Sequence, residues 1–352
     1  MKTLFAATLV FIFSFSDAPA TTFYTGPSAT GNGSGSDAAN LLGWTYNNIF
    51  GKAHGSGTNG NTMLLVDGVY AGGMTLDGGS NLTIQAQNKW KAIITGGSGV
   101  NGWGLLCNDG SPWIPTGITF DGLCVSNNMR SGLGITHNST IKNCWVVTNG
   151  WGYDLPTTGA INVGDGIDVG TGGDATWTNN IIENNLVEWN GSFNTSEAGK
   201  DHGHGMYCAG GDNIIRGNVF RYNAAWGFQI FSGYKVQAMT NCNVYNNLTY
   251  GQTEGRGFVI YSALGDPDSP FVRGDHPGHN YIFGNTFYDG FEARYGTIHI
   301  TNNIIFGQIA NQTSLTVLYG HNASTYNQFV GAGGLVVSES TLKFRNVGNG
   351  LF

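Results

Sequence analysis

The chain has 352 residues, of which 57 are glycine, and only 11% of its residues are charged. A helical bundle or coiled coil needs many charged, helix-forming residues, so this composition excludes those classes. Hydrophobic residues at 40% and aromatic residues at 12% can build a large core, which excludes a disordered chain. The net charge of −7 argues against a nucleic-acid partner, because nucleic-acid binding depends on neutralising phosphates.

The N-terminus has the pattern of a secretory signal. Lys2 precedes an apolar stretch from Leu4 to Phe15, and Ala18-Pro19-Ala20 follows as a small-residue cleavage site. We therefore expect a signal peptide over 1–20 and a mature chain over 21–352 that is secreted, to the extracellular space or the periplasm. The apolar stretch is short for a bilayer and no later segment approaches the required length, so we expect no membrane span.

The cysteines give no pairing pattern. Their number is odd, so in an oxidising compartment at least one stays free or pairs between chains. No CxxC motif is present, which argues against a thiolate metal site, and we expect buried thiols that pack as small apolar groups. The five residues are Cys107, Cys124, Cys144, Cys208 and Cys242.

Two short patterns alternate along the chain. The first is a small residue followed by an apolar, a variable and an apolar residue: Gly166-Ile167-Asp168-Val169, Gly205-Met206-Tyr207-Cys208, Gly227-Phe228-Gln229-Ile230, Gly257-Phe258-Val259-Ile260 and, more loosely, Thr297-Ile298-His299-Ile300. The second ends in asparagine, at Asn185, Asn218, Asn247, Asn285 and Asn303. One such unit cannot bury its apolar face alone, whereas copies stacked in parallel can. We expect the asparagines to form one column that hydrogen-bonds to the turns.

These repeats resemble the right-handed parallel β-helix of the pectate-lyase-like superfamily. Residues 36–50 are similar to the amphipathic helix that caps the open end of such solenoids. Residues 60–70 are similar to the strand and turn that alginate lyases and chondroitinase B-like lyases place after the cap. The resemblance implies an all-β fold, a single-domain right-handed parallel β-helix solenoid over 21–352 with an N-terminal capping helix. We expect it to be a monomer.

The glycine-containing repeat predicts where a site lies. If its two apolar residues point inward, the glycine and the variable residue point outward, and the glycines leave a shallow trough along the solenoid. The predicted edges of the trough are Asp168, Tyr207, Gln229, Val259 and His299 on one side and Asp165, His204, Trp226 and Arg256 on the other. Two long loops, 191–204 and 262–279, flank the same strands, and the first carries Lys200-Asp201-His202.

The resemblance implies a lyase that acts on an acidic, uronate-containing polysaccharide by β-elimination. This reaction needs a group that neutralises the carboxylate, a base for the C5 proton and an acid for the leaving oxygen. Arg256, or a Ca²⁺ held by Asp165, Asp168 and Asp201, is expected to neutralise the carboxylate. Lys200 or His204 is the expected base, and Tyr207 or the other basic residue the acid. The residues expected to contact substrate are Asp165, Asp168, Asp201, His202, Trp226, Gln229 and His299.

Three alternatives stay open at this stage. Gly164-Asp165-Gly166-Ile167-Asp168 and Gly203-His204-Gly205 are similar to two motifs of polygalacturonases, which are inverting hydrolases with paired Asp residues, although the Asp-Asp coil and the Arg-x-Lys motif are absent. A uronate epimerase shares the proton abstraction, but the Asp-Pro-His-Asp signature of mannuronan epimerases is missing. A non-catalytic glycan-binding or cell-surface solenoid would use aromatic side chains as stacking platforms.

Overall fold

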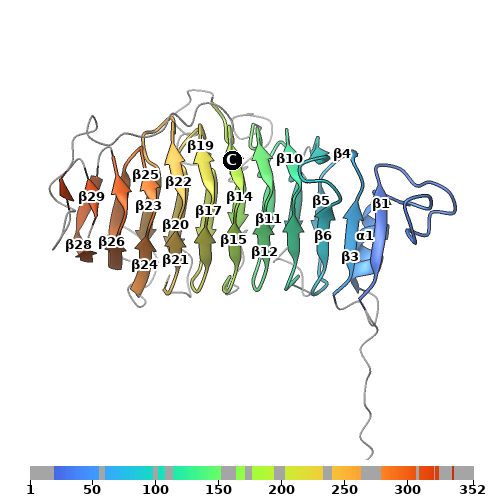
Figure 1. Cartoon of the computed structure of the whole chain (residues 1–352), viewed down its shortest axis with the longest axis horizontal. Helices are drawn as coiled ribbons and strands as arrows, with labels where there is room; N and C mark the ends of the chain where they lie inside the picture. Colours follow the sequence, from blue (N-terminus) through green and yellow to red (C-terminus); the bar gives the residue numbers. More distant parts are fainter. Residues whose placement is uncertain are drawn as a thin grey trace, which may run out of the picture.

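In the computed structural model the chain forms a solenoid of parallel strands. The structure describes residues 20–54, 60–97, 102–107, 114–151, 164–170, 177–193, 203–232, 240–262, 279–306, 309–320, 322–324 and 335–336. Strands lie side by side in chain order, from β1 (Thr22–Gly26) and α1 (Tyr46–His54) at one end to β28 (Ile309–Gly320) and β29 (Ala323–Ser324) at the other (Figure 1). The expected signal peptide falls almost entirely on residues 1–19, which lie outside the described residues.

The strands form three parallel faces, and each coil contributes one strand to each face. The first face contains β5 (Met74–Leu76), β8 (Leu105–Cys107), β11 (Leu133–Ile135), β14 (Ile167–Val169), β17 (Met206–Ala209), β20 (Phe228–Ser232) and β23 (Phe258–Ser262). The second contains β1, β3 (Thr62–Leu65), β6 (Thr83–Ala86), β9 (Thr119–Asp121), β12 (Thr140–Lys142), β15 (Ile181–Glu183), β18 (Ile214–Arg216), β21 (Asn243–Tyr245) and β24 (His279–Phe283), with β2 (Leu42–Gly43) paired to β1.

The third face is a separate sheet. It contains β4 (Gly68–Ala71), β7 (Ala92–Thr95), β10 (Cys124–Ser126), β13 (Trp145–Val147), β16 (Leu186–Glu188), β19 (Val219–Arg221), β22 (Leu248–Tyr250), β25 (Thr286–Phe287), β27 (Ile304–Ile305), β29 and β30 (Leu335–Val336). Near the end of the solenoid, β26 (Phe291–Thr301) continues from the first face onto the second, pairing with β23 and then with β24, and β28 pairs along it. The expected right-handed parallel β-helix is confirmed.

Alternation along each short strand builds the core. On the second face Ile182, Ile215 and Val244 are fully buried in the middle of their strands, while the residues on either side are half-buried. Because successive side chains of a strand point to opposite faces, each coil contributes its central apolar residue to the interior. Stacked phenylalanines continue this core on the first face, where the Phe228 and Phe258 ring centroids are 4.3 Å apart.

The asparagine repeat encodes the turn between the second and third faces. Its first position adopts a left-handed backbone, with φ of 56° at Asn184 and 64° at Gly217, a conformation that glycine and asparagine tolerate best. Its second position is the predicted column. Asn185 donates from its backbone N–H and its Nδ2 to Asn218 Oδ1, at 3.0 and 2.9 Å, and Asn218 repeats this toward Asn247. The column continues through Asn285, Asn303 and Asn322, so the predicted ladder is confirmed.

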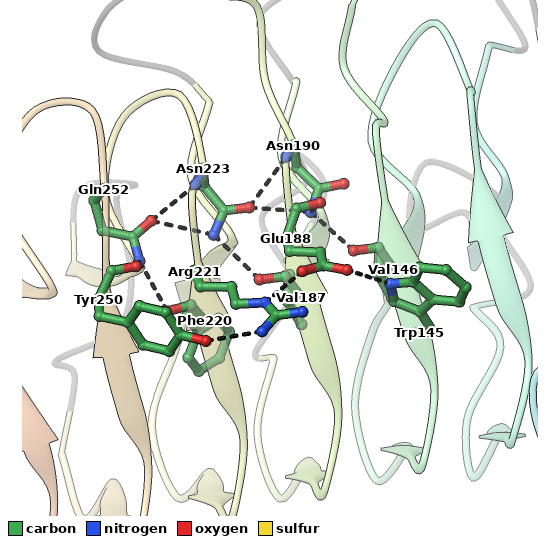
Figure 2. Close-up of polar contacts among 10 residues, drawn as sticks. All are labelled: Trp145, Val146, Val187, Glu188, Asn190, Phe220, Arg221, Asn223, Tyr250 and Gln252. Atoms are coloured by element: carbon green, nitrogen blue, oxygen red, sulfur yellow. Dashed lines mark hydrogen bonds and ion pairs between the residues drawn. The ribbon is translucent and has the colours of Figure 1, made fainter. Parts of the chain in front are cut away.

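A second ladder lies at the turn between the third and first faces (Figure 2). Asn190 donates to Asn223, and Asn223 donates to Gln252, through both the backbone N–H and the side-chain amide. Beside it on the third face, Arg221 forms an ion pair with Glu188 and donates to Tyr250 Oη at 2.8 Å. These amides provide the partners that the buried turns would otherwise lack.

The capping helix differs from the expected range of 36–50. The Asp37 carboxylate accepts the N–H groups of Ala39 and Asn40 at 2.9 and 3.1 Å and so closes a turn instead of a helix. Helix α1 begins at Tyr46, after Thr45, whose Oγ1 accepts the Asn48 N–H at 3.3 Å as an N-cap. The expected boundaries were therefore wrong, while the helix itself lies at the predicted end of the solenoid (Figure 1).

All five cysteines are free and buried, as expected from the sequence. Desolvation raises the pKa of each thiol, to about 11 for Cys124 and about 12 for Cys144 and Cys242. Burial thus favours the protonated thiol over the thiolate in each case. Among the described residues no helix has the length and apolar character needed to cross a membrane.

The ladder leads to a stability prediction. Asn218→Ala should lower the free energy of unfolding by about 3 kcal/mol or more, because it orphans the amide groups of Asn185 and the carbonyl of Ile182 in a buried turn. Asn243→Ala, which removes one hydrogen bond near the surface, is the matched control and should cost less than about 0.5 kcal/mol. Urea unfolding of both variants measures the difference, and equal effects would contradict a structural role for the ladder.

Candidate active site

Four of the predicted residues form one row across successive coils of the first face. The N–H of Gly166 donates to His204 O at 3.0 Å, that of Gly205 to Trp226 O at 2.9 Å, and that of Gly227 to Arg256 O at 3.0 Å. The residues before these glycines, Asp165, His204, Trp226 and Arg256, are therefore neighbours although they are up to 91 positions apart in the sequence. We call these four residues the site row.

Asp165 is fixed at one end of the row. Its side chain is buried, and its Oδ1 accepts the backbone N–H of His204 at 2.7 Å. Its own N–H donates to Ser131 Oγ in the preceding coil at 3.0 Å. Burial raises the pKa of this carboxyl to about 7, since the hydrogen bond from His204 offsets only part of the cost of desolvating the charge. The group therefore changes charge near neutral pH.

The rest of the row is a stack of rings that ends in an ion pair. The His204 and Trp226 rings are stacked with centroids 4.6 Å apart and an interplanar angle of 17°. The Arg256 guanidinium lies 5.6 Å from the Trp226 ring centroid, within cation–π range. Its Nε is 2.5 Å from Glu292 Oε2. The row thus presents a carboxyl, an imidazole, an indole and a guanidinium in sequence.

The variable residues of the repeat form a second row beside the first. Strand register aligns Asp168 with Tyr207, Tyr207 with Gln229, Gln229 with Val259, and Val259 with Glu292. Tyr207 is half-buried, and its ring lies nearly parallel to that of His204 with centroids 6.4 Å apart. The two rows therefore contact each other at two points, Tyr207 with His204 and Glu292 with Arg256.

The prediction for His299 is wrong. Its segment lies in β26 beyond the corner, where His299 aligns with Tyr281 on the second face. There its ring stacks on Tyr281 at 4.7 Å, and His299 Nε2 lies 2.6 Å from His279 Nδ1. Burial, and to a smaller extent His279, lowers the pKa of His299. The residue at the expected position of the second row is Glu292.

Sequence reasoning missed four copies of the glycine repeat on the first face, one of which is Gly73-Met74-Thr75-Leu76 in β5. Gly290-Phe291-Glu292-Ala293 is another, and it supplies the acidic partner of Arg256. Gly104-Leu105-Leu106-Cys107 and Gly132-Leu133-Gly134-Ile135 are the others, in the two coils before Asp165. The same small–apolar–variable–apolar pattern would have found all four. The Gly132 copy is preceded by Ser131, whose Oγ accepts the N–H of Asp165.

The glycines of the repeat do not form the expected trough. A Cβ on Gly205 would lie 2.4 Å from Gly227 O, 2.7 Å from Asn223 Nδ2 and 3.0 Å from Phe220 Cδ1. These atoms belong to the next coil, the turn ladder and the core, so the glycine faces inward. The alternation used in the prediction fails here because the chain is still turning when it reaches the glycine. Glycine is required because the coils approach each other too closely for a side chain.

Three predicted residues, Lys200, Asp201 and His202, lie outside the described residues. Of the two long loops, only 191–193, 203–204, 262 and 279 are described. Within the described part of the chain, no group of three or more His, Cys, Asp or Glu residues could hold a metal ion. Asp165 and Asp168 share one coil, and Asp165 Oδ1 already accepts the His204 N–H. The third predicted ligand, Asp201, lies outside the described residues, so the calcium site stays a prediction.

Comparison with known proteins supports the fold. No family model and no curated protein sequence matches the chain. Among solved structures, it is similar to the pectate lyase Pel9A, with a TM-score of 0.55 and 16% identity over 92% of this chain and 74% of that one. An alginate lyase from Paenibacillus sp. str. FPU-7 matches with a TM-score of 0.44 and 14% identity over 86% of this chain and 99% of that one.

The A-module of the mannuronan C-5 epimerase AlgE4 from Azotobacter vinelandii is a more distant match. Its TM-score is 0.37, at 14% identity over 80% of this chain and 94% of that module. At such identities the likeness to Pel9A establishes the right-handed parallel β-helix, and no activity follows from it.

The inward glycines give a second stability prediction. Gly205→Ala should destabilise the protein by about 1–3 kcal/mol, because a backbone oxygen of the next coil must move. Gly51→Ala is the control. No atom lies within 4 Å of a Cβ there, and alanine in α1 should stabilise by up to about 1 kcal/mol. Urea unfolding measures both, and an unchanged stability of Gly205→Ala would support outward glycines after all.

Asp165 makes stability depend on pH. Since its folded-state pKa is raised, the unfolded chain ionises first as pH rises from about 4 to about 7, and folding stability falls over that window by at most about 1.4 kcal/mol per pH unit. Asp165→Asn keeps an acceptor for the His204 N–H and removes the titration. The difference in unfolding free energy between variant and wild type should therefore increase toward neutral pH, and a constant difference would contradict the buried carboxyl.

Proposed function

We propose that the chain is a secreted enzyme that cleaves an acidic, uronate-containing polysaccharide by β-elimination at the site row. The observation that carries the proposal is the combination of chemical groups in one row. A tyrosine and an arginine that reach solvent flank a buried imidazole–indole stack. The β-helix fold and its likeness to a pectate lyase support the choice of substrate class.

Arg256 is the proposed contact for the uronate carboxylate. Its side chain is 36% exposed, whereas that of its partner Glu292 is 5% exposed. A guanidinium has five N–H donors, so it can donate to Glu292 on one side and to a second carboxylate on the other. Negative charge develops on the carboxylate as the C5 proton leaves. The contact with Arg256 would stabilise that charge and so favour removal of the proton.

Tyr207 is the proposed acid, and Lys200 the proposed base. His204 is completely buried, so it meets no polysaccharide directly and acts instead behind Tyr207, whose ring it faces. In the reaction the base takes the C5 proton, the electron pair forms the C4–C5 double bond, and the C4–O bond breaks. The Tyr207 hydroxyl then gives its proton to the leaving oxygen. His204 and Trp226 are positioning residues in this scheme.

A hydrolase is the second candidate, and one observation favours it. Burial raises the pKa of Asp165 to about 7, which favours the protonated form that a general acid needs. Asp168 lies in the same coil. This arrangement matches the polygalacturonase-like Gly-Asp-Gly-Ile-Asp segment noted in the sequence. Both Asp side chains are nearly completely buried, which is why we rank hydrolysis second.

Product analysis separates these reactions. Polygalacturonate, alginate and glycosaminoglycans are each incubated with the protein, and elimination is recognised by the ultraviolet absorbance of its unsaturated product. New reducing ends without that absorbance would indicate hydrolysis, and altered uronate stereochemistry without cleavage would indicate epimerisation. Retention on a glycan gel with no product would indicate a binding protein. Calcium dependence, predicted from the sequence alone, is tested in the same assay by exhaustive chelation.

Tyr207→Phe should reduce turnover at least about 100-fold, since it removes only the proton donor and leaves the ring in place. Tyr281→Phe, on the second face and 38% exposed, is the matched control and should retain wild-type turnover. Initial rates on the best substrate are the measurement. Full activity of Tyr207→Phe would refute its role as the acid.

A further inference from the structure

A cavity lies at the N-terminal end of the solenoid, in coils well before the site row. It has a volume of about 470 Å³, within the range of about 300–1,000 Å³ typical of ligand pockets. It is formed where the start of α1 meets the connection between β4 and β5. Its lining includes Trp44, Thr45, Tyr46, Gly72, Thr75 and Asp77. We call it the cap pocket.

One wall of the cap pocket is a fixed aromatic ring. Trp44 is half-buried and packs edge-on against the buried Tyr70, with ring centroids 5.2 Å apart and an interplanar angle of 74°. Its Nε1 lies 3.5 Å from the carbonyl oxygen of Gly72, in the connection between β4 and β5. An indole held in this way keeps its orientation, so stacking a ligand on it costs little side-chain entropy.

The lining also contains polar groups. Tyr46, 38% exposed, points its hydroxyl at Asp77 Oδ2 at 3.4 Å. Burial, and then the charge of Asp77, raises the pKa of Tyr46, so the phenol stays protonated as a donor. Thr45 and Thr75 add two hydroxyl groups to the lining. The cap pocket thus combines one apolar ring with several hydrogen-bonding groups.

We propose that the cap pocket binds a neutral hexopyranose unit of a glycan. The apolar face of a pyranose can lie on the Trp44 ring, while its hydroxyls donate to Asp77 and exchange hydrogen bonds with Tyr46, Thr45 and Thr75. An acidic sugar is disfavoured, because the Asp77 carboxylate would repel it and the described lining contains no Lys, Arg or His. A compact cation would suit Asp77 but would leave the hydroxyl groups unused.

This site is independent of the proposed lyase function. Its residues lie between 44 and 77, whereas the site row begins at Asp165. A neutral sugar held there would anchor the protein to a mixed glycan without taking part in cleavage. Loss of cap-pocket binding should therefore leave cleavage of a short, purely acidic oligosaccharide unchanged.

The test is an NMR titration of the ¹⁵N-labelled full chain with simple glycosides, followed at the indole N–H signal of Trp44. That signal is assigned by its loss in the Trp44→Phe variant. Methyl glucoside, methyl galactoside and methyl mannoside are the neutral probes. At least one should shift the signal in a saturable way, and Asp77→Asn should weaken its binding about tenfold or more. Tyr46→Phe should weaken it as well, and Tyr281→Phe, far from the pocket, should leave it unchanged. Urea unfolding confirms that each variant is folded.

The proposal is overturned if no glycoside shifts the Trp44 signal, even when each is added up to the limit of its solubility. It is equally overturned if galacturonate or tetramethylammonium binds as well as the best glycoside, or if Asp77→Asn binds that glycoside as tightly as the wild type. Cleavage by the site row, measured on the same preparations, is a separate result and decides only the proposed lyase function.

Discussion

The hydrogen bond between neighbouring coils is the interaction on which this structure depends. Most strands have only two to five residues and pair in parallel with strands of the neighbouring coils, and alone such a strand could bury almost nothing. The buried turns are the weak point of such a stack, because their backbone groups lie away from water. Side-chain amides meet that need, in one ladder from Asn185 to Asn322 and in a second through Asn190. The shape of the site follows, since the same stacking aligns residues from distant parts of the chain.

Much of the fold could be predicted from the sequence because its repeats have a simple physical meaning. An apolar residue between two polar ones marks a strand, and the Asn-Asn or Gly-Asn pair marks a turn that needs one left-handed residue and one amide. The placement of Asp165, His204, Trp226 and Arg256 in one row followed from that repeat alone. The direction of the glycines did not follow, because strand alternation does not hold where the chain is still turning.

His299 and Glu292 illustrate the limit of the same reasoning. In most coils a turn separates the first face from the second, but β26 runs through the corner as one strand. Its second half, with Thr297-Ile298-His299-Ile300, reads like the glycine repeat although it belongs to the other face. The partner of Arg256 was missed for the same reason. Short patterns predict which residues form a strand, whereas the face on which that strand lies depends on where the chain bends.

The electrostatics of the site row depend on contacts that no spacing could reveal. Glu292 balances the charge of Arg256, and burial raises the pKa of the Asp165 carboxyl. In the proposed reaction, a uronate would meet a guanidinium that Glu292 and the Trp226 ring already orient. Because His204 and Trp226 are buried, contact with the proposed substrate would fall to Tyr207 and Arg256.

The most direct test is a crystal structure of the Lys200→Ala variant, which lacks the proposed base but keeps the site row, with an acidic oligosaccharide bound. The sugar units are predicted to follow the solenoid axis along the first face, with one carboxylate on the Arg256 guanidinium and a glycosidic oxygen within hydrogen-bonding distance of Tyr207 Oη. An oligosaccharide bound along the second or third face, with Arg256 still paired only to Glu292, would contradict it.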